Sequence, residues 1–129
     1  MNLRELLGAA EEPSAQILTL YIASRDRNGK AVKNIRKWIK EAEEILSSIG
    51  GGSTSMPPAD GTWLNRETGK LVRENTTLIY TFIDPDRLVE NMGRLRKFLH
   101  NYGRETNQGE VAAEFDGKFY KIRAYDRER

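Results

Sequence analysis

Twice along the chain, a stretch of residues with strand-like composition is followed by one in which apolar residues recur every three or four positions. Residues 17–24, ILTLYIAS, are rich in β-branched and aromatic side chains and predict a strand. Residues 31–49 have helical spacing and predict an amphipathic helix. The apolar stripe of this helix consists of Val32, Ile35, Ile39, Ala42, Leu46 and Ile49, with Trp38 and Ile45 on its borders.

The same order returns after residue 52. Residues 53–65 predict a strand that is broken at the Pro57-Pro58 pair, because proline cannot donate a hydrogen bond to a strand ladder. Residues 70–83 predict a long strand, and Asp84-Pro85 is typical of a helix start. The second helix is marked by Leu88, Met92, Leu95, Leu99 and Tyr102, and we expect it to end at Gly103.

Near the end of the chain, Asp116-Gly117 separates two short strand patterns and predicts a β-hairpin. The full order is therefore strand, helix, strand, strand, helix, strand and one more strand. With right-handed crossovers, this order predicts an α+β fold, a ferredoxin-like βαββαβ sandwich. Its antiparallel sheet carries two helices on one face and a C-terminal hairpin strand. We expect one domain over residues 1–129, with residues 1–15 as a short helix ended by Pro13, or as an arm.

The glycine-rich stretch GGGSTS, residues 50–55, resembles a phosphate-binding loop only in composition. Such a loop follows a strand, opens a helix and closes with Gly-Lys-Ser/Thr, whereas these glycines follow a helix and no lysine is present. We therefore expect residues 50–53 to be a helix terminus that leads into a strand and binds no phosphate. Gly50 is the expected left-handed cap.

Composition narrows the classes of function. Hydrophobic residues make up 38% of the 129 residues, enough for one modest core, and the net charge is +2. The chain has no cysteine and a single histidine, so a disulfide framework and a zinc site are not expected, and no cofactor is predicted. The first residues lack a signal-peptide pattern, and no apolar run approaches the roughly 20 residues that cross a bilayer, so we expect a cytoplasmic protein without membrane contact.

Two helices cover only one face of such a sheet. By size and apolarity, Leu78, Tyr80 and Phe82 are expected to pack on the helices, and Ile79 and Thr81 to lie on the opposite face. The first strand adds Ile17, Thr19 and Tyr21 to that opposite face. This face is too apolar to be left in water, so we expect either a homodimer, sheet against sheet, or a small ligand to cover it.

Basic residues gather before and within the first helix. Residues 25–40 hold seven basic side chains against one acidic one, and nucleic-acid contact through them is an alternative function. The residues that would carry it are Arg25, Arg27, Lys33, Lys37 and Lys40. Solvated helix faces are also commonly charged, and no aromatic strand motif for stacking on bases is present.

Polar residues are dense in RETNQGEV, residues 104–111, the joint between the second helix and the following strand. A ligand at the uncovered sheet face or at this joint is the leading hypothesis. The candidate contacts are Tyr21, Thr54, Trp63, Tyr80, Arg104, Gln108 and Glu110. Glu110, Glu114 and Asp116 alternate and could attract a hard metal ion, but they lack a fourth acid, so no metal site is predicted. His100 is either a general base oriented by Glu105 or Glu110, or an exposed helix residue.

The segments LTLYIASRDRNGK, GGSTSMPPADGTW and RETNQGEV, in that order, resemble small uncharacterised prokaryotic proteins with a GG-x-T segment and a G-x-W. The resemblance covers most of the chain after residue 16 and brings no activity with it. From the residues we predict a binding or regulatory module. The alternatives are a small hydrolase or phosphodiesterase acting on a phosphate-containing substrate, and a nucleic-acid-binding protein.

Overall fold

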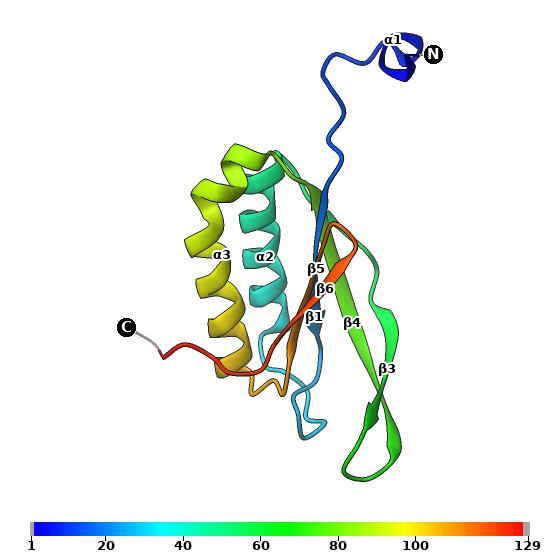
Figure 1. Cartoon of the computed structure of the whole chain (residues 1–129). Helices are drawn as coiled ribbons and strands as arrows, with labels where there is room; N and C mark the ends of the chain where they lie inside the picture. The colour runs from blue at the N-terminus through cyan, green and yellow to red at the C-terminus, as the bar shows by residue number, and fades with distance from the viewer. Residues whose placement is uncertain (1, 128–129) are drawn as a thin grey trace.

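The computed structural model describes residues 2–127, and these residues form one helical layer and one sheet layer (Figure 1). The sheet contains β1 (Ile17–Ala23), β2 (Thr54–Ser55), β3 (Ala59–Asn65), β4 (Lys70–Phe82), β5 (Val111–Phe115) and β6 (Lys118–Ile122). The helices α2 (Ile35–Gly50) and α3 (Pro85–Glu105) cover one face of it. The strand order β2-β4-β1-β5-β6, with β3 also paired to β4, confirms the α+β, ferredoxin-like prediction and its added hairpin strand.

The N-terminal helix α1 (Leu3–Leu7) stands away from both layers at the end of an extended segment (Figure 1). It ends at Gly8, which takes the left-handed conformation with φ 66°, and not at Pro13 as expected. None of its residues is buried. Across residues 2–127, no helix joins the length and the apolar character that spanning a membrane requires.

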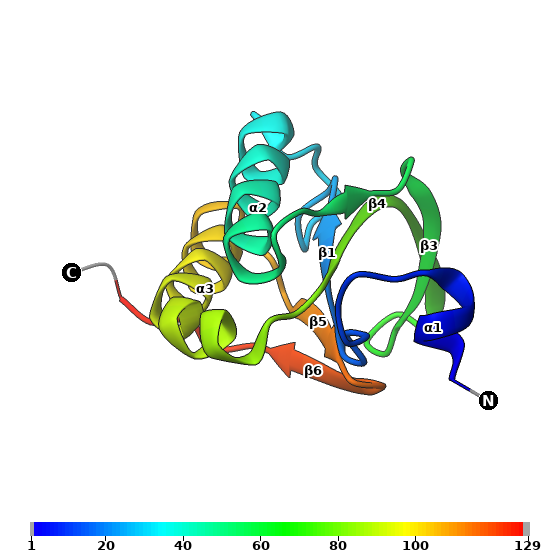
Figure 2. The same ribbon diagram turned by 90° about the horizontal axis from the view of Figure 1, so that it is seen from above.

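The core lies between the helices and one face of the sheet, which we call the helix face. Leu18, Leu20 and Ile22 of β1 point into it, as the period-two alternation predicts. The buried stripe of α2 packs against α3, where Trp38 lies 5.6 Å from the ring of Tyr102. The opposite face, which we call the open face, is covered by neither α2 nor α3; α1 projects to this side in the view from above, but none of its residues is buried (Figure 2).

The prediction for the two faces of β4 is wrong. Antiparallel pairing sets Leu20 opposite Ile79, and directly paired residues point to the same face. Ile79 is therefore fully buried against the helices, while Phe82 is 48% exposed on the open face. Threonines occupy the helix face of β4 near its end because α2 comes close there, and the Thr81 hydroxyl donates to the carbonyl of Gly52 at 2.6 Å.

Both long helices end within two residues of the predicted ends, but only α3 begins where predicted. α2 begins at Ile35, four residues after the predicted start at Ala31, because Ala31 forms a β-bridge with Arg25. Asp84 caps α3 by accepting from the amides of Asp86 and Arg87, as predicted. The left-handed cap of α2 is Gly51, with φ 88°, rather than Gly50, so the helix terminus before β2 is confirmed with a shift of one residue. α3 continues past Gly103 to Glu105, and Met92, predicted for its apolar face, is 48% exposed.

Tyr102 closes a gap in the sheet. The pairing of β1 with β5 stops at Tyr21, so the backbone of Ala23 lacks a partner on that side. The Tyr102 hydroxyl forms hydrogen bonds with both backbone groups of Ala23: it donates to the carbonyl at 3.0 Å and accepts from the amide at 2.8 Å. Burial raises the pKa of this phenol far above its ordinary value, because the charged form would lose its hydration.

We expect the raised pKa of Tyr102 to make the fold sensitive to alkali. The phenol of the unfolded chain ionises near its ordinary pKa of 10.0, whereas the phenol of the folded chain keeps its proton at that pH. The contribution of Tyr102 to the free energy of unfolding is therefore fully present below pH 10 and decreases as the pH rises above 10. Tyr102→Phe should flatten this loss and, at neutral pH, lower the free energy of unfolding by about 1.5 kcal/mol through the orphaned Ala23 groups. Urea unfolding at pH 7 and pH 10.5 measures both effects. An equally steep alkaline loss in the variant would contradict the assignment to Tyr102.

Candidate ligand pocket on the open face

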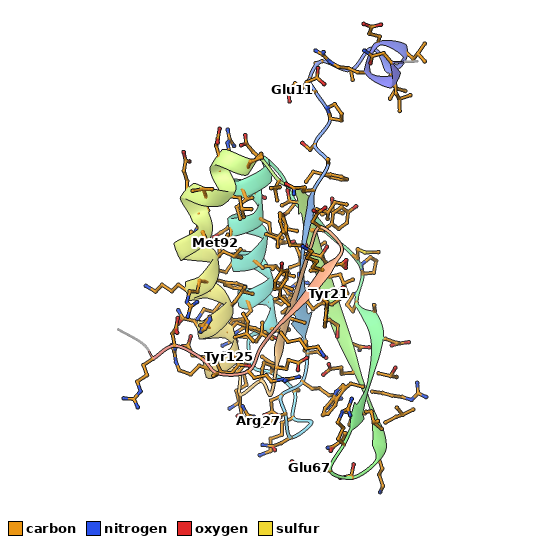
Figure 3. All side chains as sticks on the ribbon, viewed as in Figure 1. Glu11, Tyr21, Arg27, Glu67, Met92 and Tyr125 are labelled. Atoms are coloured by element: carbon orange, nitrogen blue, oxygen red, sulfur yellow. The ribbon has the colours of Figure 1, made fainter. Side chains whose placement is uncertain are left out.

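A pocket of about 550 Å³ lies on the open face, where the ends of several strands and two loops meet. Its walls come from β1, the loop after β1, the β3–β4 hairpin, the joint after α3, and the β5–β6 hairpin. Figure 3 shows Tyr21 pointing away from the helices, toward this side of the sheet. The aromatic and charged residues that line it are Tyr21, Trp63 and Phe119, Asp26, Glu74 and Glu110, and Arg25, Arg27, Arg66 and Arg123.

Three aromatic rings give the pocket flat apolar walls. Tyr21 is held on the open face by the alternation of β1, and the ring of Phe119 meets it edge to face at 5.6 Å. The third ring, Trp63, is 40% exposed and comes from the edge strand β3. Aromatic walls of this kind favour a planar ring in the ligand.

Glu74 brings a half-buried carboxylate into the pocket from β4. Burial raises the pKa of this carboxyl, and the positive charge of Arg25 opposes the rise. The Glu74 side chain has no hydrogen bond or ion pair with other residues of the described chain. A carboxylate placed this way can accept hydrogen bonds from hydroxyl or amino groups of a ligand.

The arginines differ in how firmly the protein holds them. Arg25 donates to the carbonyl of Gly29 at 2.9 Å, and Arg27 donates to the carbonyl of Gln108 at 2.9 Å. Arg123 pairs with Glu110 at 3.0 Å. Arg66 has no such partner among residues 2–127, so its guanidinium is available to an anionic group.

Four of the seven predicted ligand contacts line this pocket: Tyr21, Trp63, Gln108 and Glu110. The other three lie elsewhere. Thr54 and Tyr80 are paired with each other on β2 and β4 outside the pocket, and Arg104 donates to the carbonyl of Asp126. Only the later part of residues 104–111 therefore lines the pocket. α3 extends through Arg104 and Glu105, and Arg104 contacts Asp126 instead of the pocket.

Sequence reasoning missed Glu74 and Phe119. Glu74 lies on the same face of β4 as Thr76 and Leu78, because these residues are two positions apart. The sequence analysis assigned Leu78 to the helix face, so it did not indicate that Glu74 lies on the open face. Phe119 pairs with Glu114 across the hairpin, which places it on the open face. Arg25 and Arg27, predicted for nucleic acid, are pocket residues.

His100 does not reach the pocket. Its side chain is buried, and its Nδ1 accepts from the Asp126 amide at 2.7 Å, so neither Glu105 nor Glu110 orients it. Glu110 lies before β5 and pairs with Arg123, so it does not form a set with Glu114 and Asp116. Within residues 2–127, no three acidic or histidine side chains come together as a metal site would require.

The three predicted nucleic-acid lysines of α2 and its approach lie outside the pocket. Lys33, Lys37 and Lys40 are exposed, and the Lys37 ammonium lies 4.9 Å from the ring centre of Trp38. Nucleic-acid contact through this surface stays a prediction.

No family model matches the sequence, and no curated protein matches it. Among solved structures, the chain resembles a phage SAM lyase in complex with S-methyl-5'-thioadenosine, with a TM-score of 0.62 and 14% identity over 89% of this chain and 94% of that one. A phage SAM lyase in its apo state gives a TM-score of 0.60 and 20% identity over 93% of this chain and 100% of that one. A Bacillus cereus protein related to NIF3 gives 0.46 and 18% identity, over 93% of this chain and 31% of that one. At these identities the likeness to the lyase shows the fold.

Proposed function

We propose that the chain binds a small molecule of the adenosine thioether class in the pocket on the open face. The observation that carries the proposal is the combination of Tyr21, Trp63 and Phe119 in one pocket with the carboxylate of Glu74, which makes no hydrogen bond within residues 2–127. The rings suit a planar base, and the carboxylate suits hydroxyl or amino groups. A volume of about 550 Å³ lies within the roughly 300–1,000 Å³ of small-molecule sites.

The resemblance to the phage SAM lyase supports the choice of ligand class. That protein holds S-methyl-5'-thioadenosine, a compound with one planar base, one sugar and one uncharged thioether. Its likeness to this chain is in the fold, so it selects the first probe to use. The pocket residues themselves supply the physical argument.

Titration with S-methyl-5'-thioadenosine tests the proposal. We expect saturable binding, and Phe119→Ala should weaken it about ten-fold, since losing an aromatic contact costs on the order of 1.4 kcal/mol. Phe82→Ala is the matched control: Phe82 is 48% exposed on the same face, close to the 51% of Phe119, but lies outside the pocket. Calorimetry gives the three dissociation constants. Equal affinity in both variants, or no binding by the parent chain, would refute the proposal.

A second candidate function is enzymatic cleavage of SAM, favoured by the half-buried Glu74 inside the pocket and by the name of the structural neighbour. If the chain acts on SAM, incubation should consume it, and Glu74→Gln should slow consumption at least ten-fold while the chain stays folded. Chromatography of the reaction mixture measures the loss of SAM. Binding of S-methyl-5'-thioadenosine without consumption of SAM would leave the binding module as the function. The predicted hydrolase or phosphodiesterase stays untested.

A further inference from the structure

We propose that residues 123–126, here called the C-terminal strap, position the pocket wall formed by Gln108–Glu110. The strap follows β6 and crosses the C-terminal end of α3 (Figure 1). Figure 3 shows Tyr125 at that end of α3, away from the tip of the β5–β6 hairpin. The strap is thus a structural link from the C-terminal segment to one wall of the pocket, and its effect on ligand affinity rests on the proposed function.

The central contact is at the carbonyl of Gln108. The Tyr125 hydroxyl donates to this oxygen at 2.8 Å, and the Arg27 guanidinium donates to it at 2.9 Å. The Gln108 side chain in turn donates to the carbonyl of Arg25 at 3.1 Å. Gln108 therefore accepts a hydrogen bond from the strap and donates one to the loop after β1. Gln108 and Arg25 both line the pocket.

The strap is itself anchored on α3. Asp126 forms two hydrogen bonds with the Arg96 guanidinium, at 2.8 and 3.0 Å. Its amide donates to Nδ1 of buried His100 at 2.7 Å, and its carbonyl accepts from Arg104 at 2.7 Å. These contacts give His100 and Arg104 a role as anchors of the strap. The sequence predicted Arg104 as a ligand contact, and His100 as either a general base or an exposed helix residue.

Tyr125 can occupy its position because residue 103 is a glycine. Gly103 lies beneath the Tyr125 ring, and a Cβ atom at this residue would overlap that ring. The first residue of the strap adds a second link to the wall, since Arg123 pairs with Glu110 at 3.0 Å. The joint between α3 and β5 belongs to no strand ladder, so these side-chain contacts supplement the few backbone hydrogen bonds that hold it, from Gln108 to Gly103 and from Arg27 to Asn107.

Tyr125→Phe is the direct test because it removes the hydroxyl and keeps the ring. The Gln108 amide bonds to the carbonyl of Gly103 at 2.9 Å, so its hydrogen exchange reports opening of the joint. We expect this exchange to be about five-fold faster in Tyr125→Phe, with exchange of the Leu20 amide in β1 unchanged. Affinity for S-methyl-5'-thioadenosine should fall about five-fold, in line with the loss of one hydrogen bond.

Two matched variants separate positioning from general loss of stability. Tyr120→Phe changes an exposed tyrosine of β6 in the same way and should leave Gln108 exchange and affinity unchanged. Gly103→Ala should speed Gln108 exchange by pushing the Tyr125 ring away, whereas Gly93→Ala in the same helix meets no atom within 4 Å and should not. Normal Gln108 exchange in Tyr125→Phe would overturn the strap proposal. A parent chain that binds no ligand but shows the exchange response would refute the proposed function and retain the strap.

Discussion

Replacing Ile79 with aspartate should leave the chain largely unfolded at neutral pH. Ile79 is fully buried beside Leu20 on the helix face, within the hydrophobic core. Burying an unpaired charge costs several kcal/mol, which is comparable to the roughly 5–15 kcal/mol that stabilise a whole domain. Circular dichroism and urea unfolding of the purified variant measure the effect.

Ile79→Ala keeps the test quantitative if the aspartate variant does not fold. Removing the buried side chain should lower the free energy of unfolding by about 2–5 kcal/mol. Phe82→Asp is the control, because Phe82 is 48% exposed at a neighbouring position of the same strand, and its stability should stay within about 1 kcal/mol of the parent. A stable Ile79→Asp chain would contradict the assignment of Ile79 to the core.

Phe82→Asp also tests the predicted homodimer, which stays a prediction. The corrected face assignment moves the expected contact of β4 from Ile79 to Tyr80 and Phe82, beside Ile17, which was already expected on the open face. If a second copy covers this face, the charge should convert a dimer into a folded monomer in sedimentation experiments. A parent chain that is monomeric at micromolar concentration would end the dimer hypothesis.

The wrong face assignment of β4 shows which structural features a local sequence pattern can predict and which it cannot. Period-two alternation correctly separated its residues into two sets, because alternation depends on backbone geometry alone. Which set faces the helices depends on the register with β1, a contact between residues about 60 positions apart, and on the close approach of α2. Size favoured Leu78, Tyr80 and Phe82 for the core, but the helix face at this end has room only for threonine beside Gly50.

The candidate site was predictable to a similar degree. Residues whose face follows from short strands or turns, such as Tyr21 and Glu110, were placed near the pocket. Glu74 depends on the register of β4, and the strap contacts depend on how residues 123–126 cross α3. His100 illustrates the second case, because its partner is the amide of Asp126 and no local pattern indicates that contact.

The glycine at the end of α2 should be intolerant of even one methyl group. A Cβ atom at Gly50 would overlap both the Thr81 hydroxyl and the Phe82 carbonyl, and the backbone oxygen cannot rotate away. Gly50→Ala must therefore move the helix end and weaken the bond from Thr81 to Gly52. We expect the free energy of unfolding to fall by about 2 kcal/mol, from an overpacking cost of roughly 3 kcal/mol less about 1 kcal/mol gained in helix propensity.

Gly93→Ala in α3 is the control, because a Cβ atom at Gly93 meets no atom within 4 Å. Its free energy of unfolding should rise by about 1 kcal/mol, so urea unfolding of the two variants should give shifts of opposite sign. A stabilised Gly50→Ala chain would mean that the helix end is free to move, and the threonines of β4 would then need another explanation.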